Sequence, residues 1–94
     1  MYNVLIRSRA EKQFAKLSKD KQIVLFKIFQ QLSENPFGIF HLKKLEGTDD
    51  GYRIVVGKLR ILLLIMNRDK YIEIIDIFRR KEASDYKRRL GLFK

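Results

Sequence analysis

Apolar residues recur at two different spacings along this 94-residue chain, and the change between them marks the elements that the sequence predicts. Residues 2–7 (YNVLIR) are dominated by β-forming side chains, which is typical of a short strand. A helix of about three turns is expected next, because apolar residues then recur at i, i+4 and i+7, at Ala10, Phe14 and Leu17. Ser8 and Glu11 have the spacing of a capping box, so we expect the Ser8 hydroxyl to cap this helix.

A second helix is predicted by a longer stripe of apolar residues. Residues 18–20 interrupt the first pattern and are suited to cap a new helix, and the stripe that follows consists of Leu25, Ile28, Phe29 and Leu32. Pro36 ends this helix because proline disfavours helical geometry in the residue before it. Three aromatic residues at helical spacing are expected in the core: Phe14, Phe26 and Phe29.

The second half of the chain changes to the pattern of strands joined by short polar turns. Residues 36–51 are expected to be a connector that Leu42 and Leu45 pin to the core. The predicted strands cover residues 52–56, 59–66 and 71–78. The run ILLLIM in the middle strand lacks alternation, which favours a central position in the sheet. A short basic helix is expected over residues 81–90, ending before Gly91.

These elements have the order β-α-α-β-β-β-α, which predicts a single α+β domain over residues 1–94. The expected architecture is a small, mainly antiparallel sheet with a helical hairpin on one face. The chain is long enough for only one modest core.

Charge narrows the choice of partners. The chain has 21 Lys and Arg against 11 Asp and Glu, a net charge of +10. Residues 1–50 contribute +3 (nine basic, six acidic), and residues 51–94 contribute +7 (twelve basic, five acidic). Basic charge alone leaves two interpretations open, a solvated surface and a surface for nucleic acid.

Several classes of site are excluded or disfavoured by composition. The chain has no Cys, which excludes disulfides and thiolate metal sites, and its only histidine is His41, which excludes a histidine pair. The longest purely apolar run is too short to span a bilayer, and no signal peptide is visible, so we expect a cytoplasmic protein with no membrane association.

Arginines at strand starts and ends are the main candidates for chemistry. Arg53, Arg60 and the pair Arg79-Arg80 belong to strands that lie about 5 Å apart when joined by tight turns. We expect them to meet on the sheet face opposite the helical hairpin, where guanidinium groups suit phosphate. Tyr86 offers an aromatic face for a nucleobase.

If such a surface cleaves RNA, the feasible nucleophile is the 2′-hydroxyl of the RNA itself. The chain shows no histidine pair, acidic pair or metal cluster for ordinary acid–base catalysis, and we expect no cofactor. Arginine is a poor proton carrier. Proton transfer then falls to Tyr86, to a lysine or to the ribosome, which favours a substrate presented by another machine.

Three segments resemble the RelE/ParE toxin superfamily. They are residues 42–47 (LKKLEG), residues 51–60 (GYRIVVGKLR) and residues 76–82 (DIFRRKE), the last followed by Tyr86. The resemblance extends over essentially the whole chain, because the predicted order of elements agrees as well. Three positions depart from the family pattern: Val55, Leu59 and Leu63.

The resemblance implies roles for four residues. Arg53 would contact the phosphate backbone and assist proton transfer, and Arg60 would hold the scissile phosphate. Arg80 would stabilise the transition state or the leaving group, and Tyr86 would stack on or activate the nucleotide. Further contacts to RNA or the ribosome are expected from basic residues in the connector and the tail: Lys43, Lys44, Arg79, Lys81, Lys87, Arg88 and Arg89.

The resemblance also implies partners. A RelE-like member would be an mRNA interferase, cutting mRNA in the ribosomal A site, and would be inhibited by a small RelB-like antitoxin in a hetero-oligomer. Two alternatives stay open: a ParE-like inhibitor of DNA gyrase, and a non-catalytic co-regulator bound to an antitoxin. Retention of all four implied catalytic residues, including Arg80 and Tyr86, favours the ribonuclease.

Overall fold

Five strands form one sheet in the computed structural model, which describes residues 1–39, 41–79 and 89–93. The strands are β1 (Asn3–Ile6), β2 (Leu42–Lys44), β3 (Gly51–Val56), β4 (Leu59–Met66) and β5 (Tyr71–Arg79). Their order across the sheet is β1-β5-β4-β3-β2, in which β1 is parallel to β5 and every other pair is antiparallel. The predicted mainly antiparallel sheet is confirmed, and the apolar strand β4 lies at its centre.

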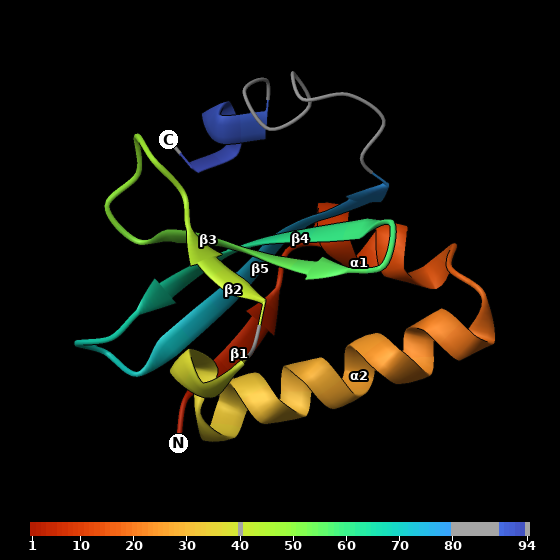
Figure 1. The fold of residues 1–94 in the computed structure, drawn as a ribbon, viewed down its shortest axis with the longest axis horizontal. Coiled ribbons are helices and arrows are strands. Elements are labelled where there is room, and N and C mark those ends of the chain that lie inside the picture. Colours follow the sequence, from red (N-terminus) through yellow and green to blue (C-terminus); the bar gives the residue numbers. More distant parts are fainter. Residues whose placement is uncertain (40, 80–88, 94) are drawn as a thin grey trace.

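Helices α1 (Ser8–Ala15) and α2 (Lys19–Glu34) follow β1 in the chain. The main core lies between them and the sheet, and Leu25, Leu32 and Ile61 within it are fully buried. Two 3-10 turns are also present in the described residues: η1 (Pro36–Gly38), which follows α2, and η2 (Leu90–Phe93). In Figure 1, α2 runs below the sheet and η2 lies above it. Neither α-helix in the described part of the chain combines the length and the apolar character needed to cross a membrane.

The structure confirms the predicted N-terminal cap of α2 but not that of α1. Ser18 caps α2 as predicted, since its hydroxyl accepts a hydrogen bond from the backbone of Lys21. The predicted capping box of α1 is wrong. Arg7 is the N-cap, without a side-chain bond, and its carbonyl accepts from the backbone N–H of Glu11, so Ser8 already lies inside the helix.

Two further expectations need correction. The predicted connector contains strand β2, which pairs with β3. Phe26 was expected in the core with Phe14 and Phe29, yet Phe26 is 56% exposed, while the other two rings pack at a centroid distance of 6.1 Å. The predicted helix over residues 81–90 lies mostly outside the described residues; within them Arg89 is α-helical, and the separate 3-10 turn η2 begins at Leu90.

Candidate functional site

Arg53 of β3 and Arg60 of β4 lie on the sheet face opposite α2. Arg53 pairs with Leu62, and Arg60 pairs with Phe78; both partners belong to a small apolar cluster separate from the main core. Directly opposed residues of an antiparallel pair share a face. Because Arg60 lies two positions from Leu62, the two arginines are diagonal neighbours, with Cβ atoms roughly 7–8 Å apart or less. The prediction that they meet on this face is confirmed.

Lys43 joins the same face and Lys44 does not. Lys43 is exposed and pairs with Arg53 across β2 and β3. Lys44 pairs with Tyr52, a residue packed against the main core, and its ammonium group lies 5.4 Å from the centre of the Tyr52 ring. Its Nζ also donates to the backbone carbonyls of residues 48 and 49, which fixes the loop before β3. We define the basic face as Lys43, Arg53 and Arg60.

Arg79 lies on the other side of the sheet. It pairs with Leu59, whose side chain belongs to the main core between the sheet and the helices. The expectation that Arg79 shares a face with Arg53 and Arg60 is therefore wrong. Five other predicted site residues lie outside the described residues: Arg80, Lys81, Tyr86, Lys87 and Arg88.

The Arg60 guanidinium is held at the turn between β3 and β4. Its NH1 group donates to the carbonyls of Gly57, at 2.8 Å, and Leu59, at 3.0 Å. Its Nε is buried and has no hydrogen-bond partner within the described part of the chain. A buried donor without an acceptor costs free energy.

Asp76 of β5 lies on the same sheet face and is completely buried. Its Oδ1 accepts from Arg9 Nε at 3.1 Å and from Gln13 Nε2 at 2.6 Å, both on α1. Its Oδ2 accepts from Arg89 NH1 at 2.6 Å. The Arg89 guanidinium also lies 3.9 Å from the centre of the Phe78 ring, a cation–π contact. Arg89, expected to contact RNA, thus also has a structural ion pair.

Asp76 is not among the residues that the sequence predicts for the site, although one feature indicates that its charge must be paired. An acidic residue inside a run of buried isoleucines must be paired, because an unpaired buried charge is too costly. Its partners could not be named from the sequence, since Arg9 and Gln13 are 67 and 63 residues away.

A second charged cluster joins the end of β1 to β5 and to the C-terminal residues. Arg7 forms an ion pair with Glu73 and donates from NH1 to the carbonyl of Leu92 at 2.9 Å. The Tyr71 hydroxyl donates to Glu73 Oε2 at 2.7 Å. This hydrogen bond, together with partial burial and the charge of Glu73, raises the pKa of Tyr71. Partial burial by itself would raise the pKa of Glu73, but hydrogen bonds from Tyr71 and Arg7 and the Arg7 charge outweigh it and lower that pKa.

We expect the Glu73 cluster to make stability depend on acid pH. A carboxyl group whose pKa is lower in the folded chain stabilises the fold above its ordinary pKa of 4.5, and that contribution is lost as pH falls through the folded pKa. The free energy of unfolding, measured by urea denaturation from pH 7 to pH 3, should therefore fall less steeply below pH 4.5 in Glu73→Gln than in the unaltered chain. Equal slopes for the two proteins would contradict this prediction.

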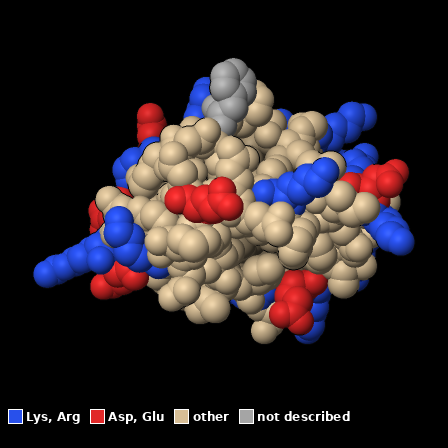
Figure 2. Space-filling view, turned by 90° about the horizontal axis from the view of Figure 1, so that it is seen from below, with Lys and Arg blue, Asp and Glu red and all other residues tan. Residues whose placement is uncertain are grey.

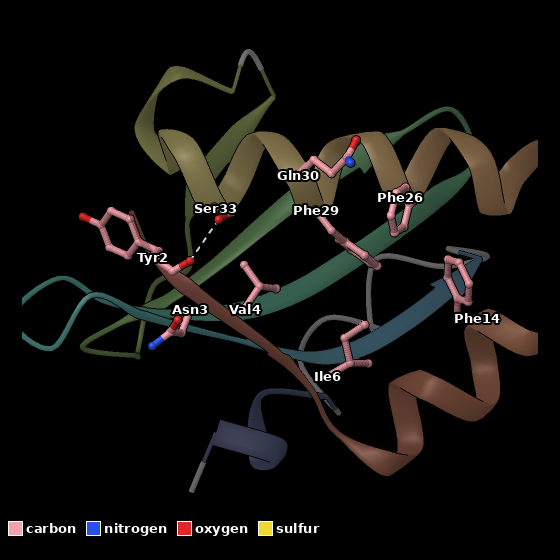
Figure 3. A pocket seen from close by; sticks show the side chains of 9 residues that line it. All are labelled: Tyr2, Asn3, Val4, Ile6, Phe14, Phe26, Phe29, Gln30 and Ser33. Atoms are coloured by element: carbon pink, nitrogen blue, oxygen red, sulfur yellow. Dashed lines mark hydrogen bonds between the residues drawn. The ribbon is translucent and has the colours of Figure 1, made fainter.

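The helical side of the molecule carries a groove of about 580 Å³ between β1 and α2, shown in Figure 3. The side chains that line it come from β1 and the residue before it, from α1 and from α2: Tyr2, Asn3, Val4, Ile6, Phe14, Phe26, Phe29, Gln30 and Ser33. None of them carries a charge. Figure 2 shows that this side of the molecule has broad areas without charged residues. The groove is suited to apolar side chains of a partner, while the basic face is suited to phosphate.

No family model matches the chain. Comparison with known proteins nevertheless finds similar proteins over most of its length. The chain is 31% identical over 84 residues to RelE1 of Methanocaldococcus jannaschii, a protein named as a toxin, covering 87% of this chain and 93% of RelE1. The RelE–RelB complex of Pyrococcus horikoshii contains a similar chain, with 29% identity and a TM-score of 0.77, covering 87% of this chain and 98% of that one. The E. coli RelBE toxin–antitoxin complex contains a chain of the same fold, with 21% identity and a TM-score of 0.74, covering 87% and 100%.

Proposed function

This chain belongs to the RelE family of toxins of toxin–antitoxin systems, and from that premise we propose that it is a ribosome-dependent endoribonuclease that cuts mRNA in the A site. The observation that carries the proposal is the basic face, where Lys43, Arg53 and Arg60 occupy neighbouring positions on three strands. Guanidinium groups present planar sets of donors and stay charged at any physiological pH, which suits the phosphates of an extended RNA.

The proposed reaction uses the 2′-hydroxyl of the RNA as the nucleophile. Its oxygen attacks the adjacent phosphorus, the bond from phosphorus to the 5′-oxygen breaks, and the products are a 2′,3′-cyclic phosphate and a 5′-hydroxyl. The 2′-hydroxyl loses a proton and the 5′-oxygen gains one. Arg60 and Arg53 would stabilise the charge that develops on the phosphate, a contribution that needs fixed cations rather than a metal.

Proton transfer is assigned to other groups, because arginine holds its proton too tightly. We propose Tyr86, a lysine or the ribosome for proton transfer, and Arg80 for stabilising the charge that develops on the leaving group; the roles of Tyr86 and Arg80 rest on the sequence resemblance. The ribosome would present the mRNA with its backbone aligned, and we expect no metal or organic cofactor.

A RelB-like antitoxin is the proposed partner. Similar chains are found with RelB in the Pyrococcus horikoshii and E. coli complexes. Two surfaces of this chain support such a partner. The uncharged groove between β1 and α2 suits apolar side chains, and the basic face attracts acidic segments.

The proposal is tested in a bacterial translation extract with a labelled message. We expect the purified chain to stop protein synthesis and to cut the message within codons occupied by the A site. A DNA supercoiling assay with gyrase, run in parallel, tests the alternative target. Intact message together with inhibited supercoiling would overturn the proposal in favour of a ParE-like inhibitor.

Arg53 and Arg79 form a matched pair for testing the basic face. We expect Arg53→Gln to weaken binding to ribosome–mRNA complexes several-fold and to lower the slope of log affinity against log salt by roughly one unit, as for one lost phosphate contact. Arg79→Gln removes the same charge from the other side of the sheet and should have little effect. Equal losses for the two variants in a binding titration over a range of salt would show that only net charge matters.

A further inference from the structure

The C-terminal residues are attached to the sheet at two described points. Arg89 binds Asp76 Oδ2 at 2.6 Å and lies over Phe78, and three residues later the Leu92 carbonyl accepts from Arg7 at 2.9 Å. Both points lie on the sheet face that also carries Arg53 and Arg60, as the register and the position of η2 in Figure 1 agree. We call these five residues, Arg7, Asp76, Phe78, Arg89 and Leu92, the C-terminal clamp.

Asp76 is the centre of this clamp because its two carboxylate oxygens bind different parts of the chain. Oδ1 is occupied by Arg9 and Gln13 of α1, and Gln13 is itself fixed, since its Oε1 accepts from the backbone N–H of Ile77 at 2.7 Å. Oδ2 has Arg89 as its partner. A fully buried carboxylate is stabilised when both of its oxygens accept hydrogen bonds, so releasing Arg89 removes the partner of Oδ2, while Arg9 stays paired with Oδ1.

The position of Arg89 connects the clamp to the basic face. Phe78, on which the Arg89 guanidinium lies, is the cross-strand partner of Arg60. Phe78, a member of the clamp, therefore lies directly opposite Arg60, the arginine that we propose holds the phosphate.

We propose that Asp76 is a positioning residue that holds the C-terminal residues 89–93 against the basic face and thereby keeps that face in the arrangement needed for cleavage. Asp76 is buried and does not contact RNA; it acts through Arg89. The effect on cleavage rests on the proposed ribonuclease function, whereas the attachment of residues 89–93 does not.

Arg89 variants test the clamp without removing the buried carboxylate. Arg89→Met removes the ion pair and leaves Arg9 and Gln13 on Asp76, while Arg89→Lys keeps the charge that pairs with Oδ2. Arg68→Met is the matched control, because Arg68 is exposed in the turn after β4 and its loss changes the net charge equally. For each variant, amide hydrogen exchange of residues 90–93, thermal unfolding, and kcat and KM for cleavage of ribosome-bound mRNA are measured.

In Arg89→Met we expect exchange at residues 90–93 to become about 10-fold faster and kcat to fall about 10-fold, with KM little changed, and unfolding to stay cooperative at a somewhat lower temperature because Oδ2 loses its partner. Arg89→Lys should recover most of both losses, and Arg68→Met should behave as the unaltered chain. Unchanged exchange in Arg89→Met, no recovery in Arg89→Lys, or faster exchange with full kcat would each overturn the positioning role. If the unaltered chain does not cleave mRNA at all, the proposed function fails, and the exchange comparison still decides whether the clamp exists.

Discussion

Arg60→Ala is expected to lower the rate of mRNA cleavage on the ribosome about 100- to 1,000-fold. The loss is of the size seen when one fixed donor to a developing anion is removed. Arg60 is placed for this role by its position on the basic face and by its bonds to the carbonyls of Gly57 and Leu59, which limit the movement of the guanidinium. The rate is measured under single-turnover conditions, so that product release does not mask the chemical step.

Two further variants separate a role in chemistry from one in binding. Arg60→Lys keeps the charge and loses the planar set of donors, so it should remain well below the unaltered rate. Arg68→Ala removes an exposed arginine of the turn after β4 and should keep full activity. A loss in Arg60→Ala that is entirely in KM, with kcat unchanged, would contradict the assignment of Arg60 to the transition state.

Ile61→Ala is expected to lower the free energy of unfolding by about 3–4 kcal/mol, the range for truncating a fully buried aliphatic side chain. Ile61 is 0% exposed and lies in the central strand between Ile54 and Ile77, so the neighbouring strands cannot move in to fill the cavity. Small domains have only about 5–15 kcal/mol of stability in total, so this one change removes a large fraction. Urea denaturation measures it as a lower midpoint with an unchanged slope.

Ile61→Val is the conservative control, because it removes a single methyl group. We expect a loss of about 1 kcal/mol. Val24→Ala makes a comparable small truncation on the exposed side of α2, where Val24 is 45% exposed, and should cost less than Ile61→Val. Equal small losses for Ile61→Ala and Val24→Ala would mean that the sheet face under the helices is not tightly packed.

Much of the fold follows from local patterns in the sequence. The stripe of Leu25, Phe29 and Leu32 fixes the buried side of α2, and the continuous apolar run of β4 predicts its central place in the sheet. Strand β2 could not be predicted in this way. It is only three residues long, and two of them are lysines, so it is a strand because β3 offers its edge rather than because of its own composition.

The candidate site was predictable where it depends on short turns and not where it depends on distant contacts. The two-residue turn at Gly57 and Lys58 places Arg53 and Arg60 close together once the strands are recognised. Arg79 was misplaced because side chains alternate along a strand, so Phe78 and Arg79 must point to opposite faces and a shift of one residue changes the side. The register of β4 against β5 also shifts between Leu62 and Leu63, and no local sequence pattern predicts this shift.

Above all, we propose that this chain cuts mRNA on the ribosome by 2′-hydroxyl attack. The most direct measurement uses purified ribosomes with a defined message and an empty A site, compared with the same message free in solution, and determines the chemistry of the ends. We predict cleavage only on the ribosome, within the A-site codon, leaving 2′,3′-cyclic phosphate and 5′-hydroxyl ends. A message that stays intact on the ribosome, or that is cut equally well free in solution, would contradict the claim.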